Sequence, residues 1–283
     1  MARIDLHIHT TCSDGTYSPS DVVALARHHG ITALAITDHD SVEGIPEALH
    51  AGRLHGIEII PGVELSAQFQ GHEVHLLGYF INWRDATLEQ RLQQLRQSRS
   101  YRLARMVERI QHLGYSLSLE EVLVKAPSAS RGRPHLAQVL VDKGYVRDIR
   151  EAFTRFLAEG ALAHVPGDFP EVETVIAWIR EAGGVPVLAH PSWSDSSGLE
   201  STRMLWAQLQ AAGLMGIEVY YSTHQPRQIS AYRRLAAHLG LLCTGGSDFH
   251  GETRPSIHMG IGRGSLHIPT AVLESLRTAA GTG

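Results

Sequence analysis

The 283-residue sequence has little cysteine, no long apolar run and no excess of either charge. Cys12 and Cys243 are its only cysteines, too few for a disulfide framework or a cysteine-based zinc site, and typical of a reducing compartment. No stretch approaches the ~18 uninterrupted apolar residues of a membrane-spanning helix, and the first residues lack the apolar centre of a secretory signal. We therefore expect a cytoplasmic protein with no membrane partner.

The charge balance limits the possible partners. The 25 Lys and Arg residues stand against 29 Asp and Glu residues, which gives a formal net charge of -4. No overall basic field is available to hold a nucleic-acid duplex, so any anion site must be local. A content of 43% hydrophobic and 19% charged residues predicts a folded protein. The length suits either two domains or one barrel-sized α/β domain.

Short apolar runs alternate with helical patterns over most of the chain. Seven runs are expected to form buried strands, at residues 3–6, 33–36, 57–60, 74–80, 185–189, 216–220 and 241–243. Five helices, each followed by a glycine, are expected at residues 18–29, 42–55, 171–182, 201–212 and 226–239. This repetition predicts an α/β fold with a parallel sheet. Seven units favour a barrel, with an open doubly wound sheet as the alternative.

One stretch, from Ala86 to Gly160, has no strand pattern. Apolar residues between Leu88 and Leu113 follow helical spacing, and further helices are expected at residues 119–125, 135–143 and 149–157. We interpret residues 86–160 as a helical insertion. Residues 1–85 and 161–283 then form the barrel.

The 18 histidines are the most informative feature, because histidine is the usual metal ligand. His7 and His9 lie two residues apart on an extended segment, so both side chains point to the same face. Further histidines and carboxylates fall at or near the ends of expected strands: Asp14, His39, Glu64, Glu73, His75, His190, Asp248 and His250. One His-x-His pair is common by chance, but burying so many polar groups without a partner is costly. The set therefore predicts a metal site.

These residues resemble the motifs of the polymerase and histidinol phosphatase (PHP) superfamily, in order and over the whole chain. The resemblance rests on His7-Ile-His9-Thr with Asp14, Thr37-Asp38-His39, Gly62-Val63-Glu64 with His75, Ala189-His190-Pro191 and Ser247-Asp248-Phe249-His250. It implies a distorted (βα)₇ barrel that holds up to three divalent metals and hydrolyses phosphate esters. Further similarity in Arg131-Gly-Arg133-Pro-His135 and Gly216-Ile-Glu218-Val-Tyr220 points to the branch of 3′,5′-nucleoside bisphosphate phosphatases and 5′-3′ exoribonucleases.

The resemblance also implies three sets of metal ligands. They are His7, His9, Glu64 and Asp248 for one ion, Asp14, His39 and His250 for a second, and Glu64, His75 and His190 for a third. Manganese is expected, with iron or zinc as alternatives, because histidine and carboxylate sites accept all three. The three ions outweigh the three carboxylates in charge, which suits a phosphate dianion. We expect a hydroxide that bridges two of the metals to attack phosphorus.

The insertion is expected to recognise the substrate. Arg99 on a helix and Arg133 on the next loop are predicted to bind phosphate, because guanidinium grips phosphate bidentately. The other arginines between residues 96 and 109 are interpreted as a solvated face. His135 and His224 are candidates for substrate binding and for the catalytic general acid. Glu218 is grouped with these catalytic candidates as the support of a histidine.

The expected reaction removes the 3′-phosphate of a nucleoside 3′,5′-bisphosphate, such as adenosine 3′,5′-bisphosphate, because arginines of the insertion can bind the second phosphate. Histidinol phosphate and short oligonucleotides are the alternative substrates. A metal-dependent amidohydrolase on a similar barrel is a more distant alternative, and a non-catalytic metal-binding module is the most distant. Hydrolysis of a phosphate monoester, compared with an N-acyl substrate, separates these classes.

Overall fold

The computed structural model describes residues 3–126, 128, 130–191 and 198–281, and these form an α/β protein. One seven-stranded sheet has its strands in chain order: β1 (Arg3–Asp5), β2 (Ile31–Ile36), β3 (Glu58–Phe69), β4 (His72–Tyr79), β5 (Val185–Leu188), β6 (Gly216–Tyr221) and β7 (Leu242–Gly246). The predicted fold class and the seven predicted strands are confirmed. The largest difference is in β3, which continues to Phe69 where the sequence pattern predicted an end at Ile60.

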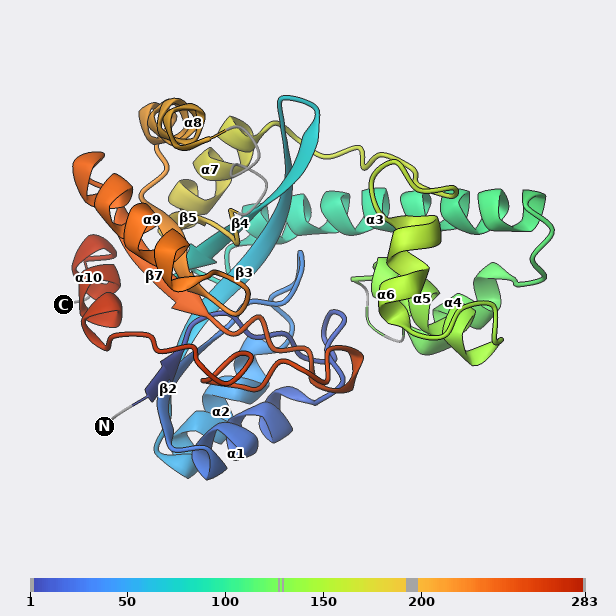
Figure 1. Cartoon of the computed structure of the whole chain (residues 1–283). Coiled ribbons are helices and arrows are strands. Elements are labelled where there is room, and N and C mark those ends of the chain that lie inside the picture. Colours follow the sequence, from blue (N-terminus) through green and yellow to red (C-terminus); the bar gives the residue numbers. More distant parts are fainter. Residues whose placement is uncertain (1–2, 127, 129, 192–197, 282–283) are drawn as a thin grey trace.

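The expectation of a wholly parallel sheet is wrong at β4, which runs antiparallel to both β3 and β5. The remaining neighbours pair in parallel. A two-residue turn, Gln70 and Gly71, joins β3 to β4 in place of a crossover helix. Both residues have positive φ, 51° and 83°, as in the hairpin turns that match the twist of paired strands. Figure 1 shows the resulting long hairpin.

The segments that follow β1 and β7 lie side by side. The backbone N–H of His9 donates to the carbonyl oxygen of Phe249 at 2.9 Å, and the N–H of Asp248 donates to the carbonyl oxygen of His7 at 2.9 Å. Ile8 and Phe249 form a parallel bridge. The polar residues that follow the first and last strands of the sheet therefore lie close together.

The helices of the main body are α1 (Pro19–His28), α2 (Ile45–His55), α7 (Val172–Glu181), α8 (Leu199–Ala211) and α9 (Pro226–His238). They match the five predicted helices with small shifts at their ends. The sequence prediction missed α10 (Ala271–Ala279), whose Val272, Leu273 and Leu276 are buried in the main core. Within the described ranges, no helix is both long enough and apolar enough to cross a membrane.

The described residues of the region predicted as an insertion form helices and the loops that connect them, with no strand. It comprises α3 (Ala86–His112), α4 (Leu119–Lys125), α5 (Arg133–Asp142), α6 (Ile149–Ala152) and a π-helical turn (Phe153–Leu157). Its apolar residues divide between two cores. Leu88, Leu92 and Leu95 pack in the main core, whereas Leu103, Met106, Val107 and Ile110 pack in a second one.

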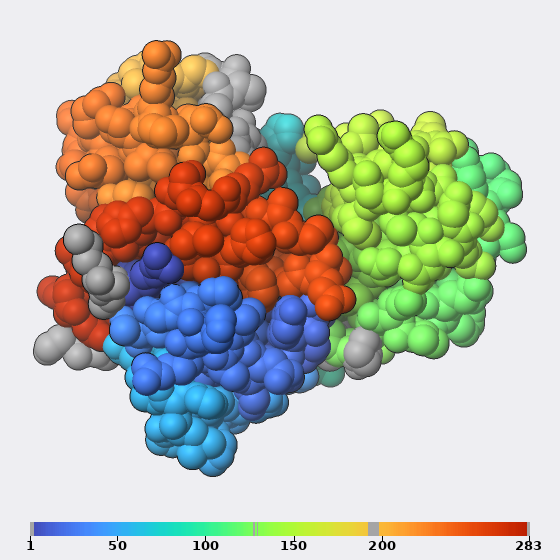
Figure 2. Space-filling view, turned by 60° about the horizontal axis from the view of Figure 1, so that its bottom comes forward, coloured from blue at the N-terminus to red at the C-terminus, as the bar shows by residue number. Residues whose placement is uncertain are grey.

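Helix α3 thus connects the main body to a lobe that contains the second core, as Figure 1 shows. In Figure 2 the green lobe stands apart from the blue and orange body, with a hollow between them. The domain boundaries at residues 85/86 and 160/161 remain a prediction, because the first turns of α3 belong to the main core.

A substitution of Phe156 tests how much the second core contributes to the stability of the protein. It is fully buried there, with its ring edge-on to Tyr115 at 5.1 Å between centroids. We expect Phe156→Ala to lower the free energy of unfolding by about 3–5 kcal/mol, because it leaves a cavity in a packed core. Urea denaturation measures this value. Leu162→Ala, at a side chain 61% exposed, is the matched control. A loss below about 1 kcal/mol for Phe156→Ala contradicts a cooperative second core.

Candidate metal centre

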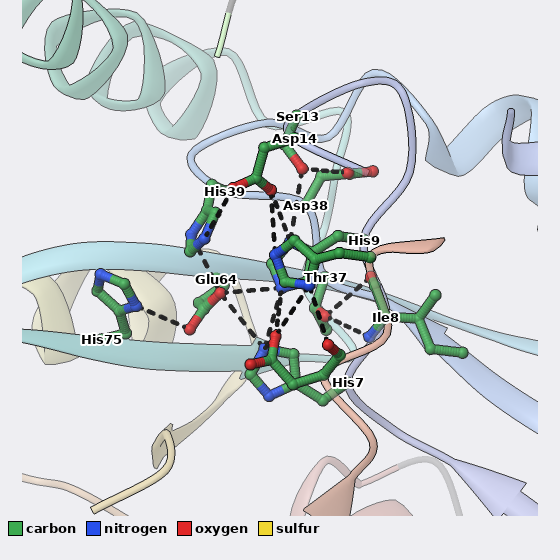
Figure 3. Close-up of polar contacts among 12 residues, drawn as sticks. His7, Ile8, His9, Ser13, Asp14, Thr37, Asp38, His39, Glu64 and His75 are labelled. Carbon is green, nitrogen blue, oxygen red and sulfur yellow. Dashed lines mark hydrogen bonds and ion pairs between the residues drawn. The ribbon is translucent and has the colours of Figure 1, made fainter. Parts of the chain in front are cut away.

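The nine predicted metal ligands converge on one side of the sheet. They follow the ends of β1, β2, β5 and β7 or lie on β3 and β4: His7, His9, Asp14, His39, Glu64, His75, His190, Asp248 and His250. The carboxyl ends of parallel strands meet at one edge, which is where α/β barrels place their chemistry. In Figure 3 the labelled ligand side chains point toward one another: His7, His9, Asp14, His39, Glu64 and His75.

A tight turn brings Asp14 back toward the strand ends. The N–H of Gly15 donates to the carbonyl oxygen of Thr10 at 2.9 Å, which closes the turn. A side chain at Gly15 would place its Cβ 2.6 Å from the carbonyl oxygen of His9, so only glycine fits here. The Asp14 carboxylate consequently lies 3.2 Å from Nε2 of His250 and 3.7 Å from Nδ1 of His9.

The central group consists of His7, His9, Glu64 and Asp248. Nε2 of His7 and Nε2 of His9 are 3.1 Å apart. Oε2 of Glu64 lies 3.3 Å and 3.2 Å from these two nitrogens, and Oδ1 of Asp248 lies 3.5 Å and 3.2 Å from them. Donors about 2.1 Å from a shared ion in tetrahedral array stand roughly 3.4 Å apart, so these spacings suit one metal.

Two further groups flank this one. His9, Asp14, His39 and His250 offer ligand atoms within 4.8 Å of one another, and so do His39, Glu64 and His75. In the group formed by His39, Glu64 and His75, Nδ1 of His39 is 3.0 Å from Oε2 of Glu64, and Nδ1 of His75 is 3.0 Å from Oε1 of Glu64. His190 lies beside the same group, with its Nε2 2.9 Å from Oε1 of Glu64. Glu64 is therefore shared between the central group and the group that contains His39 and His75.

Several buried polar atoms in these groups make no hydrogen bond to any residue that the structure describes. They are Asp14 Oδ1, His39 Nδ1, Glu64 Oε2 and His250 Nε2. Such an unsatisfied atom costs about 1–3 kcal/mol, and a cation within reach of its lone pairs removes that cost. Imidazole and carboxylate ligands together accept manganese, iron or zinc. The residues present therefore fit divalent metal ions.

The carboxylates of the centre are held in the ionised form. Burial alone would raise the pKa of Asp14, but the neighbouring imidazoles of His250 and His39 outweigh burial and hold this pKa well below its usual range. Burial would likewise raise the pKa of Glu64, yet His39 and His7 hold it well below its usual range. Burial opposes protonation of His75, but Glu64 raises its pKa to about 9. A metal that binds His75 must therefore displace a proton at neutral pH.

Residues behind the ligands hold them in place. Oε1 of Glu218 is 3.0 Å from Nδ1 of His7, and its Oε2 accepts the N–H of His190 at 2.8 Å. Glu218 is fully buried and contacts both His7 and His190, as expected of a carboxylate that supports metal ligands. The Tyr221 hydroxyl donates to Oδ2 of Asp248 at 2.8 Å, and Arg254 also donates to this oxygen.

These contacts leave Oδ1 of Asp248 facing the histidines. No sequence motif singled out Tyr221 or Arg254 as part of the site. Tyr221 directly follows a motif residue of β6, which is a weak signal, whereas no spacing rule points to Arg254, six residues after Asp248.

A cavity of about 320 Å³ lies beside His75 and His190 and reaches the helical insertion. Arg102 and Arg133 line it. Nη1 of Arg102 donates to Oε2 of Glu73 at 2.9 Å, and Nη2 of Arg133 forms an ion pair with the same oxygen at 3.1 Å. Burial lowers the pKa of Arg133 to about 10, which leaves it charged at neutral pH. Arg96 and Arg102 are both buried, so the interpretation of these two arginines as part of a solvated face is wrong. The cavity thus combines two cations with the edge of the metal-ligand cluster.

The other predicted substrate residues lie outside the lining of this cavity. Arg99 forms a buried ion pair with Asp40. Nδ1 of His135 accepts a backbone N–H at the start of α5 at 3.1 Å. Nδ1 of His224 donates to the carbonyl oxygen of Val219 at 2.9 Å. Their roles in substrate binding and catalysis remain predictions.

Comparisons of this chain with known proteins all point to one protein family. The model of the PHP domain matches residues 5–184. The chain is 34% identical over 258 residues to a 3′,5′-nucleoside bisphosphate phosphatase of Chromobacterium violaceum, covering 88% of each protein. It is 32% identical over 248 residues to a 5′-3′ exoribonuclease of Haemophilus influenzae, covering 88% of this chain and 90% of the relative.

A solved structure agrees with these sequence relatives. A proposed metal-dependent phosphoesterase from Bifidobacterium adolescentis superposes with a TM-score of 0.87 at 30% identity. The superposition covers 98% of this chain and 96% of that one. The likeness therefore extends over both the sheet and the helical insertion. The chain belongs to the PHP domain family, and it is a metal-dependent phosphoesterase.

Proposed function

We propose that this phosphoesterase removes the 3′-phosphate of nucleoside 3′,5′-bisphosphates and releases a 5′-monophosphate and inorganic phosphate. The observation that supports this most is the cavity that Arg102 and Arg133 line together with His75 and His190. A substrate with two phosphates can place one at the metal ligands and the other at the arginines. The Chromobacterium violaceum relative bears the name of this activity.

We also propose that three divalent ions bind, most readily manganese, with iron or zinc as alternatives. The ligand sets are His7, His9, Glu64 and Asp248; Asp14, His39 and His250; and Glu64, His75 and His190. Bound ions would supply Lewis acidity, which activates water as a nucleophile and offsets charge on phosphate oxygens.

The protein side chains orient the substrate and move protons. Arg102 and Arg133 hold the second phosphate by charge-assisted hydrogen bonds, and this remote binding orients the reacting phosphate. His135 and His224 are proposed to bind substrate and to donate the proton that the leaving 3′-oxygen needs. Glu218 keeps Nδ1 of His7 engaged, so that Nε2 of the same ring faces the cluster.

A second candidate is removal of nucleotides from the 5′ end of short oligonucleotides. The Haemophilus influenzae relative is named for such an activity. An exonuclease that releases 5′-nucleotides breaks the same bond, between the 3′-oxygen and phosphorus, as the proposed phosphatase. The net charge of -4 favours short single strands over a duplex.

The three-ion proposal predicts the metal content. After loading with manganese and removal of free ions, elemental analysis should find more than one ion per chain, because the ligands form three groups. Asp248→Asn should lower this ratio and reduce turnover by at least about 1000-fold, since one ligand is lost. His28→Asn, at an exposed histidine of α1, is the matched control. A wild-type ratio of one or less would refute three ions.

The arginine cavity predicts a substrate-dependent defect. Arg133→Ala should lower kcat/KM for adenosine 3′,5′-bisphosphate by roughly 10- to 200-fold, the equivalent of one charge-assisted hydrogen bond. Hydrolysis of a small aryl phosphate should change little, because that substrate has no second phosphate. Arg147→Ala, on the same lobe and 86% exposed, controls for general effects. Equal losses on both substrates would show that Arg133 acts on the reacting phosphate or is structural.

The substrate assignment is tested by comparing kcat/KM for adenosine 3′,5′-bisphosphate, 5′-AMP, 3′-AMP and histidinol phosphate with manganese present. We expect the bisphosphate to be the best substrate, because only it fills both sites, and 5′-AMP to be poor. Chromatography should identify 5′-AMP as the product. Equal rates would indicate a general phosphatase, and a preference for histidinol phosphate would overturn the assignment.

A further inference from the structure

Asp40, the residue directly after His39, is fully buried beside the metal ligands. Its N–H donates to the carbonyl oxygen of Glu64 at 2.8 Å. Its carboxylate accepts the N–H of Ser66 at 2.9 Å and the hydroxyl of Ser66 at 3.1 Å. Asp40 therefore joins the loop that carries His39 to the strand that carries Glu64.

The backbone of Asp40 has a φ of 48°, in the left-handed region. Aspartate is among the few residues other than glycine that adopt this region with any ease. The turn at Asp40 directs the chain away from β2 immediately after His39. Its side-chain contacts with Ser66 hold that turn in place.

Two arginines of α3 complete this arrangement from the insertion. Nε of Arg99 donates to Oδ2 of Asp40, and Nη2 of Arg99 donates to the hydroxyl of Ser66 at 2.5 Å. Nη1 of Arg96 donates to the backbone oxygen of Asp40 at 3.0 Å. The side chain of Arg99 is only 10% exposed, so Arg99 and Asp40 form a buried ion pair. The insertion helix thus reaches the loop that bears a metal ligand.

We propose that Arg99 and Asp40 form a positioning pair that holds His39 and Glu64 in the geometry needed to bind metal. The helical insertion then completes the metal centre in addition to contacting the substrate. This inference rests on the proposed ligand roles of His39 and Glu64. It differs from the prediction that Arg99 binds substrate phosphate, because a positioning pair acts before any substrate is present.

The pair has an energetic consequence that a phosphate contact lacks. Removing one member of a buried ion pair leaves the other charge without compensation, which disrupts its surroundings. Removing both charges together does not leave that unpaired charge. If Asp40 holds the loop of His39, Arg99→Gln should therefore disturb metal binding more than the double change Arg99→Gln with Asp40→Asn does.

The experiment measures manganese binding to the full chain without substrate, by calorimetric titration and by electron paramagnetic resonance of the bound ion. Arg99→Gln should weaken at least one binding step by about 10- to 100-fold, the usual effect of losing a residue that supports a ligand. The bound-ion spectrum should change as well. Arg99→Lys should recover part of the affinity, and so should the double variant.

The matched control is Arg91→Gln. Arg91 lies on the same helix and pairs with Glu181 of α7 at 2.5 Å, away from the metal ligands. This variant should bind manganese as the wild type does. If it also loses metal, the effect belongs to helix docking in general, and the assignment to Arg99 and Asp40 is refuted.

Two other outcomes decide the proposal. Wild-type metal binding and spectrum in Arg99→Gln, with a raised KM for the bisphosphate alone, would make Arg99 a phosphate contact and overturn the positioning role. If Arg99→Gln does not fold, Arg99→Lys and the double variant supply the same comparison, and wild-type metal binding in both, with no spectral change, overturns the role. Because no substrate is used, failure of the nucleotide assignment leaves this result intact.

Discussion

A single buried carboxylate, that of Glu64, determines how the centre is arranged. Five imidazole nitrogens lie within 3.3 Å of its two oxygens: those of His7, His9, His39, His75 and His190. A carboxylate removed from water costs several kcal/mol unless positive charge and hydrogen bonds compensate it. Its two oxygens face different histidines, so ions bound on both sides can share one carboxylate. The strand ends that carry His7, His9, His39 and His190, and His75 within β4, must therefore lie close to the middle of β3.

The fold meets this requirement through the length and register of β3. The strand continues past the point where β2 ends, and Glu64 lies in its middle, opposite Leu77 of β4. His75 is opposite Ser66, two residues along and thus on the same face as Glu64. At the end of β7, a side chain on Gly246 would place its Cβ 2.2 Å from Cβ of His7. Glycine there lets β7 approach His7 closely.

The sequence predicts the ligands and the main elements because both have local signals. Apolar runs that end in histidine or carboxylate mark the ends of strands, and the order of the motifs matches one superfamily. The strand β4 was predicted but its antiparallel direction was missed, although Gln70 and Gly71 between two apolar runs form a recognisable turn. Arg102 and Arg254 could not be assigned from sequence, because which arginine of a helix or loop is buried depends on tertiary packing.

The proposed role of the cavity in binding a second phosphate depends on how its charged side chains are paired. Arg102 and Arg133 both bind one oxygen of Glu73, and Arg102 also donates Nε to the carbonyl oxygen of Val165 at 2.7 Å. Each guanidinium has five N–H donors, so these contacts leave donors for a ligand. Glu73 neutralises one of the two charges, which weakens the hold on a free anion. In the proposed function, an anion tethered to a group at the metal ligands is then favoured over free phosphate, because its second attachment raises its local concentration.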